Sequence, residues 1–218
     1  MVSSRHLRSQ SLKDKINDKI EACTVFYFFV RCFLEQTYSK REFLLNLLKA
    51  AKDPFCSDEK LNDIRKVLMD SKNFSGTNHL ILLKDYFSDD RVFYLEKKDA
   101  FLQADRAIEE GNIIGYYYLY LLYLKEDSKK AVQCLKKVIN KSYPLADLAY
   151  AKHLLTGDIV DKDEDEAFKY YQIASRFNLA EGYYGMILIL QRRGDFMEAK
   201  KVYDQATENG ISLPGVVR

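Results

Sequence analysis

The sequence has no tryptophan and, among its 218 residues, only three prolines, nine glycines and four cysteines. Proline and glycine are the residues that most often interrupt helices. Their scarcity, together with the absence of long β-branched alternation, favours an all-α fold. The cysteines form no Cys-x-x-Cys pair and have no histidine at metal-ligand spacing, which argues against a zinc site and against a disulfide framework. We therefore expect an all-α protein whose thiols are reduced.

The sequence also lacks a marked excess of either charge and a long hydrophobic run. Its 34 basic and 32 acidic residues give a net charge of +2, which supplies no strong field for binding a nucleic acid. The most apolar run of the N-terminal half, Cys23 to Leu34, is interrupted by Arg31 and is much shorter than the roughly 20 residues that span a membrane. We expect this run to be a buried helix, and we expect the protein to be cytoplasmic, without a nucleic-acid or membrane partner.

Motifs that carry catalysis are also missing. The sequence contains no glycine-rich phosphate loop, no Gly-x-Ser-x-Gly and no His-Glu-x-x-His, and its histidines, at positions 6, 79 and 153, are scattered. The acidic run Asp161 to Glu166 lacks the glycine of a calcium-binding loop, so we interpret Asp163 as the N-cap of a helix instead. We predict no catalytic residue, no metal, no cofactor and no enzymatic activity.

A repeat is present in the second half of the chain. Two small residues seven positions apart recur in four blocks, each followed by a turn-tolerant residue and then by a small or helix-stopping one. Seven residues make about two helical turns, so both small side chains share one face and let a neighbouring helix approach closely. Second helices are expected to begin at Gly115, Ala146 and Gly182, which makes each unit a helix-turn-helix. The four blocks are Ala100–Ala107, Ala131–Val138, Ala167–Ala174 and Ala199–Ala206.

These residues resemble the Sel1-like repeat, a short relative of the tetratricopeptide repeat. Residues 146–174 are similar to one nearly complete copy, although Tyr170 stands where the family usually has tryptophan. The resemblance implies a right-handed α-solenoid of helix-turn-helix repeats with an N-terminal helical region. The positions that match are Ala146, Tyr150, Ala151, Leu154, Gly157, Val160, Asp163, Ala167, Tyr170, Tyr171 and Ala174.

The resemblance and the composition together predict three regions. Residues 1–11 are expected to form a mobile tail. Residues 12–98 are expected to form a helical region, with degenerate repeats as one interpretation, and residues 99–218 are expected to form the repeat array.

The binding surface is predicted from the tyrosine-rich run Tyr116 to Tyr123. A helix cannot easily bury every side chain of this run, so some rings should be exposed. The alternative is that the N-terminal helices fold over the run and cover it. Aromatic and arginine side chains on a rigid face are typical anchors of protein interfaces. The residues predicted to bind a partner are Tyr116, Tyr118, Asp147, Lys152, Glu181, Tyr183 and Arg192.

The resemblance implies a non-catalytic module that binds another protein, such as a bacterial adaptor, chaperone or toxin-neutralising immunity protein. The alternative function is a self-associating structural scaffold, in which the segment Ile211 to Arg218 docks on a neighbouring copy. An enzyme with an assembled carboxylate site is a third interpretation. The partner is expected to be a protein, and the chain itself a monomer or a weak homo-oligomer.

Overall fold

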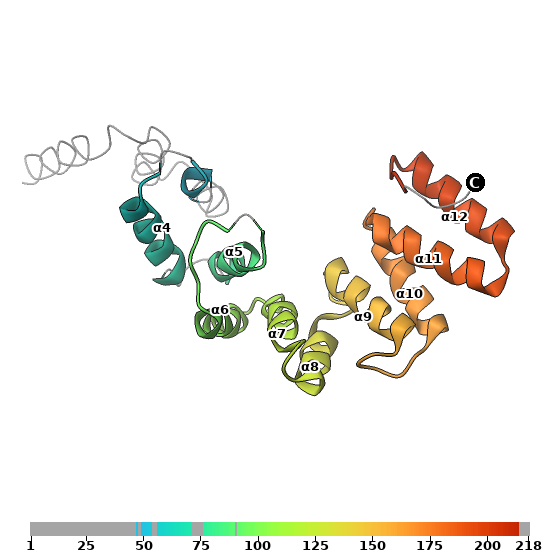
Figure 1. The fold of residues 1–218 in the computed structure, drawn as a ribbon, viewed down its shortest axis with the longest axis horizontal. Coiled ribbons are helices and arrows are strands. Elements are labelled where there is room, and N and C mark those ends of the chain that lie inside the picture. Colours follow the sequence, from blue (N-terminus) through green and yellow to red (C-terminus); the bar gives the residue numbers. More distant parts are fainter. Residues whose placement is uncertain (1–46, 48, 54–55, 71–75, 90, 214–218) are drawn as a thin grey trace, which may run out of the picture. The chain divides into compact units, whose positions relative to one another are not determined.

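The computed structural model describes residues 47, 49–53, 56–70, 76–89 and 91–213 (Figure 1). Across these residues the regular elements are helices, and none is a strand. The chain divides into two compact units, Met1–Gly115 and Tyr116–Arg218. The predicted mobile tail, residues 1–11, and the apolar run from Cys23 to Leu34 lie outside the described residues, so both expectations stay predictions.

The first unit contains three long described helices: α4 (Asp58–Asp70), α5 (Thr77–Tyr86) and α6 (Lys97–Glu109). Helix α5 packs against both α4 and α6. Their shared core includes Ile64 and Leu68 of α4, Leu82 of α5, and Phe93 from the connection before α6. Burying each such large apolar side chain contributes about 1.5–3 kcal/mol, which holds these helices together.

The second unit consists of successive helices, each of which from α8 onward packs against the next one along the chain. The predicted all-α solenoid of helix-turn-helix repeats is therefore confirmed. Figure 1 shows α9 to α12 following one another in yellow to red. The helices are α7 (Gly115–Tyr123), α8 (Ser128–Val138), α9 (Pro144–Thr156), α10 (Glu164–Ser175), α11 (Ala180–Arg193) and α12 (Phe196–Glu208).

The regularly spaced small residues lie where neighbouring helices approach each other. Ala167 and Ala174 of α10 are fully buried. A side chain at Gly182 of α11 would place its Cβ only 2.6 Å from the Ser175 amide nitrogen and 2.9 Å from the Tyr171 carbonyl oxygen. The backbones of α10 and α11 therefore meet at a distance that only glycine permits. This is the physical reason for the repeat seen in the sequence.

The turns between helices use the capping chemistry that their residues predict. Asp163 accepts a hydrogen bond from the Glu166 amide at 2.8 Å, which confirms it as the N-cap of α10. Asp127 caps α8 in the same way, accepting from the Lys130 amide at 3.0 Å. Within the described residues, no helix combines the length and the apolar character that crossing a membrane would require.

Candidate partner-binding surface

Three of the predicted binding residues are buried, so the expectation that they are exposed is wrong. Tyr118, Asp147 and Tyr183 have exposed fractions of 7%, 1% and 3%. The Tyr183 hydroxyl accepts a hydrogen bond at 2.8 Å from the side-chain amide of Asn209, just beyond α12, and Asp147 Oδ1 accepts one at 2.8 Å from the Asn140 amide. These side chains therefore stabilise contacts between repeats.

The tyrosine-rich run of α7 is largely packed within the second unit. The Tyr117 ring meets the Tyr143 ring edge-on, with centroids 5.1 Å apart. The Tyr118 ring meets the Tyr117 ring edge-on, with centroids 5.7 Å apart, and burial together with the proximity of Tyr143 and Tyr117 raises the pKa of the Tyr118 hydroxyl. The Tyr143 ring, just before α9, thus covers part of the run, which neither sequence-based alternative anticipated. Tyr116, the first ring of the run, is half-buried.

The other three predicted residues, Lys152, Glu181 and Arg192, are exposed. Glu181 and Arg192 belong to one face of α11, because Glu181, Tyr184, Leu188 and Arg192 follow one another at spacings of three or four residues. We call these four residues the α11 stripe. Tyr184 is 49% exposed, although its neighbour Tyr183 is buried.

Sequence reasoning missed Tyr184 by one position. The signal that could have found it is the glycine pair Gly182 and Gly185, because a side chain at either position would collide with α10. Both glycines must therefore face α10, which turns Tyr184 toward solvent. Among the described large apolar side chains of α11, Tyr184 is the exposed one.

The end of α11 is tied to the beginning of α10 by ion pairs. Arg192 Nη1 lies 3.6 Å from Glu164 Oε1, and Arg193 Nη2 lies 2.8 Å from Asp165 Oδ1. The Arg192 side chain nevertheless keeps 49% of its surface exposed. The α11 stripe thus ends on a charged side chain whose guanidinium is paired with Glu164 and is still accessible to a partner.

A surface groove of about 480 Å³ lies beside α10. We call it the α10 groove. At its rim the Asn140 side-chain amide donates a hydrogen bond to the Tyr170 hydroxyl at 3.2 Å. The Tyr170 ring also packs edge-on against Tyr150, with centroids 5.0 Å apart. The residues that line the α10 groove are Asn140, Asp163, Asp165, Glu166, Lys169, Tyr170 and Ile173.

In the second unit, Tyr120, His153 and Asp158 are hydrogen-bonded in series, in the order hydroxyl, imidazole, carboxylate that catalytic relays also use. Here the series connects helices. The Tyr120 hydroxyl donates to His153 Nε2 at 2.7 Å, and His153 Nδ1 donates to Asp158 Oδ1 at 2.8 Å. Tyr120 is only 4% exposed, and burial raises the pKa of its hydroxyl to about 12. A buried hydroxyl that keeps its proton at neutral pH is a poor base or nucleophile. These hydrogen bonds instead join α7 to α9 and to the loop that follows α9.

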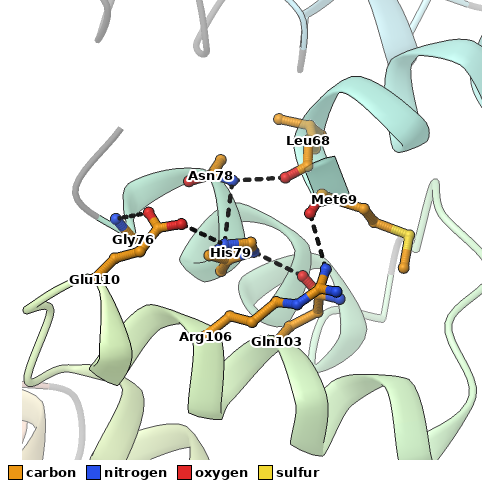
Figure 2. Close-up of polar contacts among 8 residues, drawn as sticks. All are labelled: Leu68, Met69, Gly76, Asn78, His79, Gln103, Arg106 and Glu110. Atoms are coloured by element: carbon orange, nitrogen blue, oxygen red, sulfur yellow. Dashed lines mark hydrogen bonds and ion pairs between the residues drawn. The ribbon is translucent and has the colours of Figure 1, made fainter. Parts of the chain in front are cut away.

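A second polar cluster lies inside the first unit, as Figure 2 shows. His79 Nδ1 donates to Gln103 Oε1 at 2.7 Å, and His79 Nε2 lies 3.3 Å from Glu110 Oε1. Glu110 Oε2 in turn accepts from the Gly76 amide at 2.8 Å. His79 and Gln103 are almost completely buried, with exposed fractions of 1% and 0%. A substrate could not reach them, so the cluster serves to connect α5 with α6.

The same cluster extends to α4. The Asn78 side-chain amide donates to the Leu68 carbonyl at 2.7 Å, and Arg106 Nη1 donates to the Met69 carbonyl at 3.0 Å (Figure 2). The last turn of α4 is therefore anchored to side chains of α5 and α6. Among the described residues, no group of histidine, cysteine, aspartate and glutamate side chains has the arrangement of a metal site.

Comparison with known proteins agrees with this architecture. Residues 112–142 and 144–176 match the family model described as Sel1 repeat. The crystal structure of a Sel1 repeat protein from Oxalobacter formigenes has a similar fold, with a TM-score of 0.55 and 16% sequence identity. The similarity covers 96% of this chain and 68% of that one. No curated protein matches the sequence significantly. Sel1 repeats generally mediate protein–protein interactions and are typically non-catalytic.

Proposed function

Because residues 112–142 and 144–176 are Sel1 repeats, we propose that this chain is a non-catalytic module that binds another protein on the surface of its helical repeats. The exposed α11 stripe is the observation that carries the proposal. Five side chains of α11 are buried, yet Glu181, Tyr184 and Arg192 remain exposed on one face. Tyrosine and arginine, both present in the α11 stripe, are the residue types that protein interfaces use most often as anchors.

The rigidity of α11 supports the same proposal. Helix α11 packs between α10 and α12, so the side chains of the α11 stripe project from a helix that is fixed on two sides. A surface that is ordered before binding loses less conformational entropy when the partner docks. Tyr184 is the central anchor in this proposal, because it is the aromatic side chain of the α11 stripe and 49% of its surface is still available for burial.

Bacterial adaptor, chaperone and toxin-neutralising immunity protein are the specific forms of this proposal, and they differ in the partner they require. An adaptor should bind two proteins at once, a chaperone should bind an unfolded client, and an immunity protein should bind and inhibit one toxin. The mixed charge of the chain, +2 overall, suits a protein partner in each case. The identity and folded state of the bound protein would distinguish the three.

The proposal is tested by affinity capture with the full chain and two variants. The double substitution Glu181→Ala with Tyr184→Ala should reduce the affinity for the captured protein about tenfold, as the loss of an interface anchor does. Tyr94→Ala is the matched control, since Tyr94 is 77% exposed but lies in the first unit. Equal capture by all three forms would reject the α11 stripe as the binding surface.

Self-association as a scaffold remains the alternative, but the described part of the proposed docking segment is occupied. Leu213 is 9% exposed and packs, together with Ile211, into the core of the second unit. The Ile211 amide also donates to the Ala206 carbonyl at 2.9 Å. Residues 214–218 lie outside the described residues. Light scattering over a range of protein concentrations would separate the two functions, because only the scaffold requires a concentration-dependent mass.

A further inference from the structure

We propose, as a refinement that rests on the proposed function, that the α10 groove receives an arginine side chain of the protein partner. The groove is formed within the second unit alone, by the N-cap and one face of α10 from Asp163 to Ile173 and by Asn140 from the turn after α8. Its volume of about 480 Å³ accommodates a long side chain together with part of the adjoining backbone.

Charge is the first argument for a basic occupant. Three carboxylates line the α10 groove against a single cation, Lys169. The surrounding sequence strengthens this bias, because the segment Asp158 to Glu166 carries six acidic residues and one lysine. The acidic residues also lie near the positive end of the α10 helix dipole, which favours their ionised forms. A positively charged side chain is therefore the complementary ligand.

Glu166 is the carboxylate that remains available. Asp163 Oδ1 already accepts the hydrogen bond that caps α10, and Asp165 Oδ1 is paired with Arg193 at 2.8 Å. Glu166 has no ion-pair partner in the part of the chain that the structure describes. Its backbone amide is fixed by Asp163 at 2.8 Å, so the carboxylate is held at the groove on an ordered helix. An incoming guanidinium could bind it without displacing an internal partner.

The lining residues Tyr170 and Ile173, which follow Glu166 on the same face of α10, favour arginine over a small cation. Tyr170 is 8% exposed and its position is fixed at both ends, by the hydrogen bond from Asn140 and by the edge-on contact with Tyr150. Ile173 adds a half-buried apolar side chain. Arginine combines a planar group that stacks on aromatic rings with a stem that packs on apolar surface. The α10 groove offers both surfaces, an aromatic ring at Tyr170 and an apolar side chain at Ile173.

The rim of the groove is ordered by a buried carboxyl group. Asp147 Oδ1 accepts from the Asn140 amide at 2.8 Å and so holds Asn140 in a left-handed conformation, with φ of 59°. Asp147 Oδ2 is buried and has no hydrogen-bond partner among the residues that the structure describes. Asn140 therefore meets an incoming side chain from a fixed position, and its bond to Tyr170 closes this end of the groove.

The test uses two blocked peptides that differ only in charge. One carries two arginines separated by alanines, and the other carries citrulline, the neutral isostere, in place of each arginine. Isothermal titration of the full chain should show that the arginine peptide binds more tightly, and more so at low ionic strength. Glu166→Gln should weaken this binding about fivefold, because it removes one partly exposed ion pair.

Two further variants sharpen the measurement. Lys169→Ala should strengthen binding of the arginine peptide about twofold, because it removes a like charge from the groove. Glu198→Gln is the matched control, because it removes one negative charge, as Glu166→Gln does. The change is on α12, where Glu198 pairs with Lys201 at 2.8 Å. This control should leave the affinity unchanged. Circular dichroism of each variant confirms that the helices are retained.

Failure of this inference is distinguishable from failure of the proposed function. Equal affinity for the arginine and citrulline peptides, no detectable binding of either, or equal effects of Glu166→Gln and Glu198→Gln would overturn the arginine site. If Glu166→Gln also leaves capture of the protein partner intact while the α11 stripe variant abolishes it, the module still binds a protein, but without the α10 groove. Binding of the arginine peptide that depends on Glu166 supports the site directly.

Discussion

The two units of this chain are both helical and both combine fully buried alanines with buried polar groups, but the contact between α5 and α6 differs in kind from the one between α10 and α11. In the first unit, the buried polar side chains His79 and Gln103 connect α5 and α6 through a hydrogen bond of 2.7 Å (Figure 2). In the second unit, fully buried alanines such as Ala167 and Ala174 allow helices to touch closely. The α5–α6 contact depends on paired hydrogen-bonding groups, and the α10–α11 contact depends on the absence of side-chain volume.

This difference determines how much of each unit a sequence reveals. Small residues at a fixed spacing recur in every repeat, so their role is visible from periodicity alone. A hydrogen bond between His79 and Gln103 joins residues 24 positions apart, and its role cannot be read from a repeated spacing of residues. Substitutions made in one unit at a time should therefore lower the stability of that unit, by a steric collision in one case and by an unpaired polar group in the other.

The largest effect is expected from Gly182→Val in the second unit. Its new Cβ would lie 2.6 Å from the Ser175 amide nitrogen, so α10 and α11 must move apart. Forcing such volume into a packed contact should lower the free energy of unfolding of the second unit by about 3 kcal/mol. Urea unfolding followed by circular dichroism measures the loss.

Gln172→Val is the control for Gly182→Val. Gln172 is exposed on α10, so its replacement introduces the same β-branched side chain without a collision. Its cost should stay below about 1 kcal/mol, which reflects helix propensity alone. Comparable losses from both substitutions would show that the close approach of α10 and α11 does not limit the stability of the second unit.

A smaller effect, confined to the first unit, is expected from His79→Leu. The change removes the donor to Gln103 Oε1 and leaves that buried oxygen without its hydrogen bond. An unsatisfied buried polar group costs about 1–3 kcal/mol. Hydrogen exchange should become faster in α4, α5 and α6, while the protection of α9 to α12 stays the same.

The double variant His79→Leu with Gln103→Leu separates polar pairing from packing. Replacing both partners by apolar side chains removes the unsatisfied group, so part of the lost stability should return. The Gln103 Nε2 atom has no hydrogen-bond partner in the described structure, which makes Gln103 the partner whose removal costs less. Additive losses from the two changes would mean that the cluster does not act as a unit.

The sequence predicted those features that depend on local pattern. These features are the start of α7 at Gly115, the helix cap at Asp163 and the stacking of the repeats. Each follows from residues within a few helical turns of one another. The choice between Tyr183 and Tyr184 was missed, although the glycine pair Gly182 and Gly185 marks the face of α11 that meets α10. The α10 groove was also missed, since it requires the turn at Asn140 to lie against Tyr170, 30 positions away.

The smallest effect is expected from Asp158→Asn, and it should appear only in acid. Although burial acts in the opposite direction, hydrogen bonds from His153 and Thr156 lower the pKa of Asp158 in the folded chain. A lowered folded pKa gives stability that is present above the ordinary aspartate value, about 3.9, and is lost as the pH falls through the folded value.

The Asp158 side chain is 52% exposed, so its contribution should be no more than about 0.5 kcal/mol after solvent screening. Asp158→Asn should reduce the acid-dependent loss of stability in the second unit, measured by thermal unfolding between neutral and acidic pH. Asp147 provides the opposite case, because burial raises the pKa of its carboxyl group. Its raised pKa adds stability on acidification, so Asp147→Asn should make the second unit more sensitive to acid. If both variants shifted the acid response in the same direction, the hydrogen bonds around Asp158 would not be the cause.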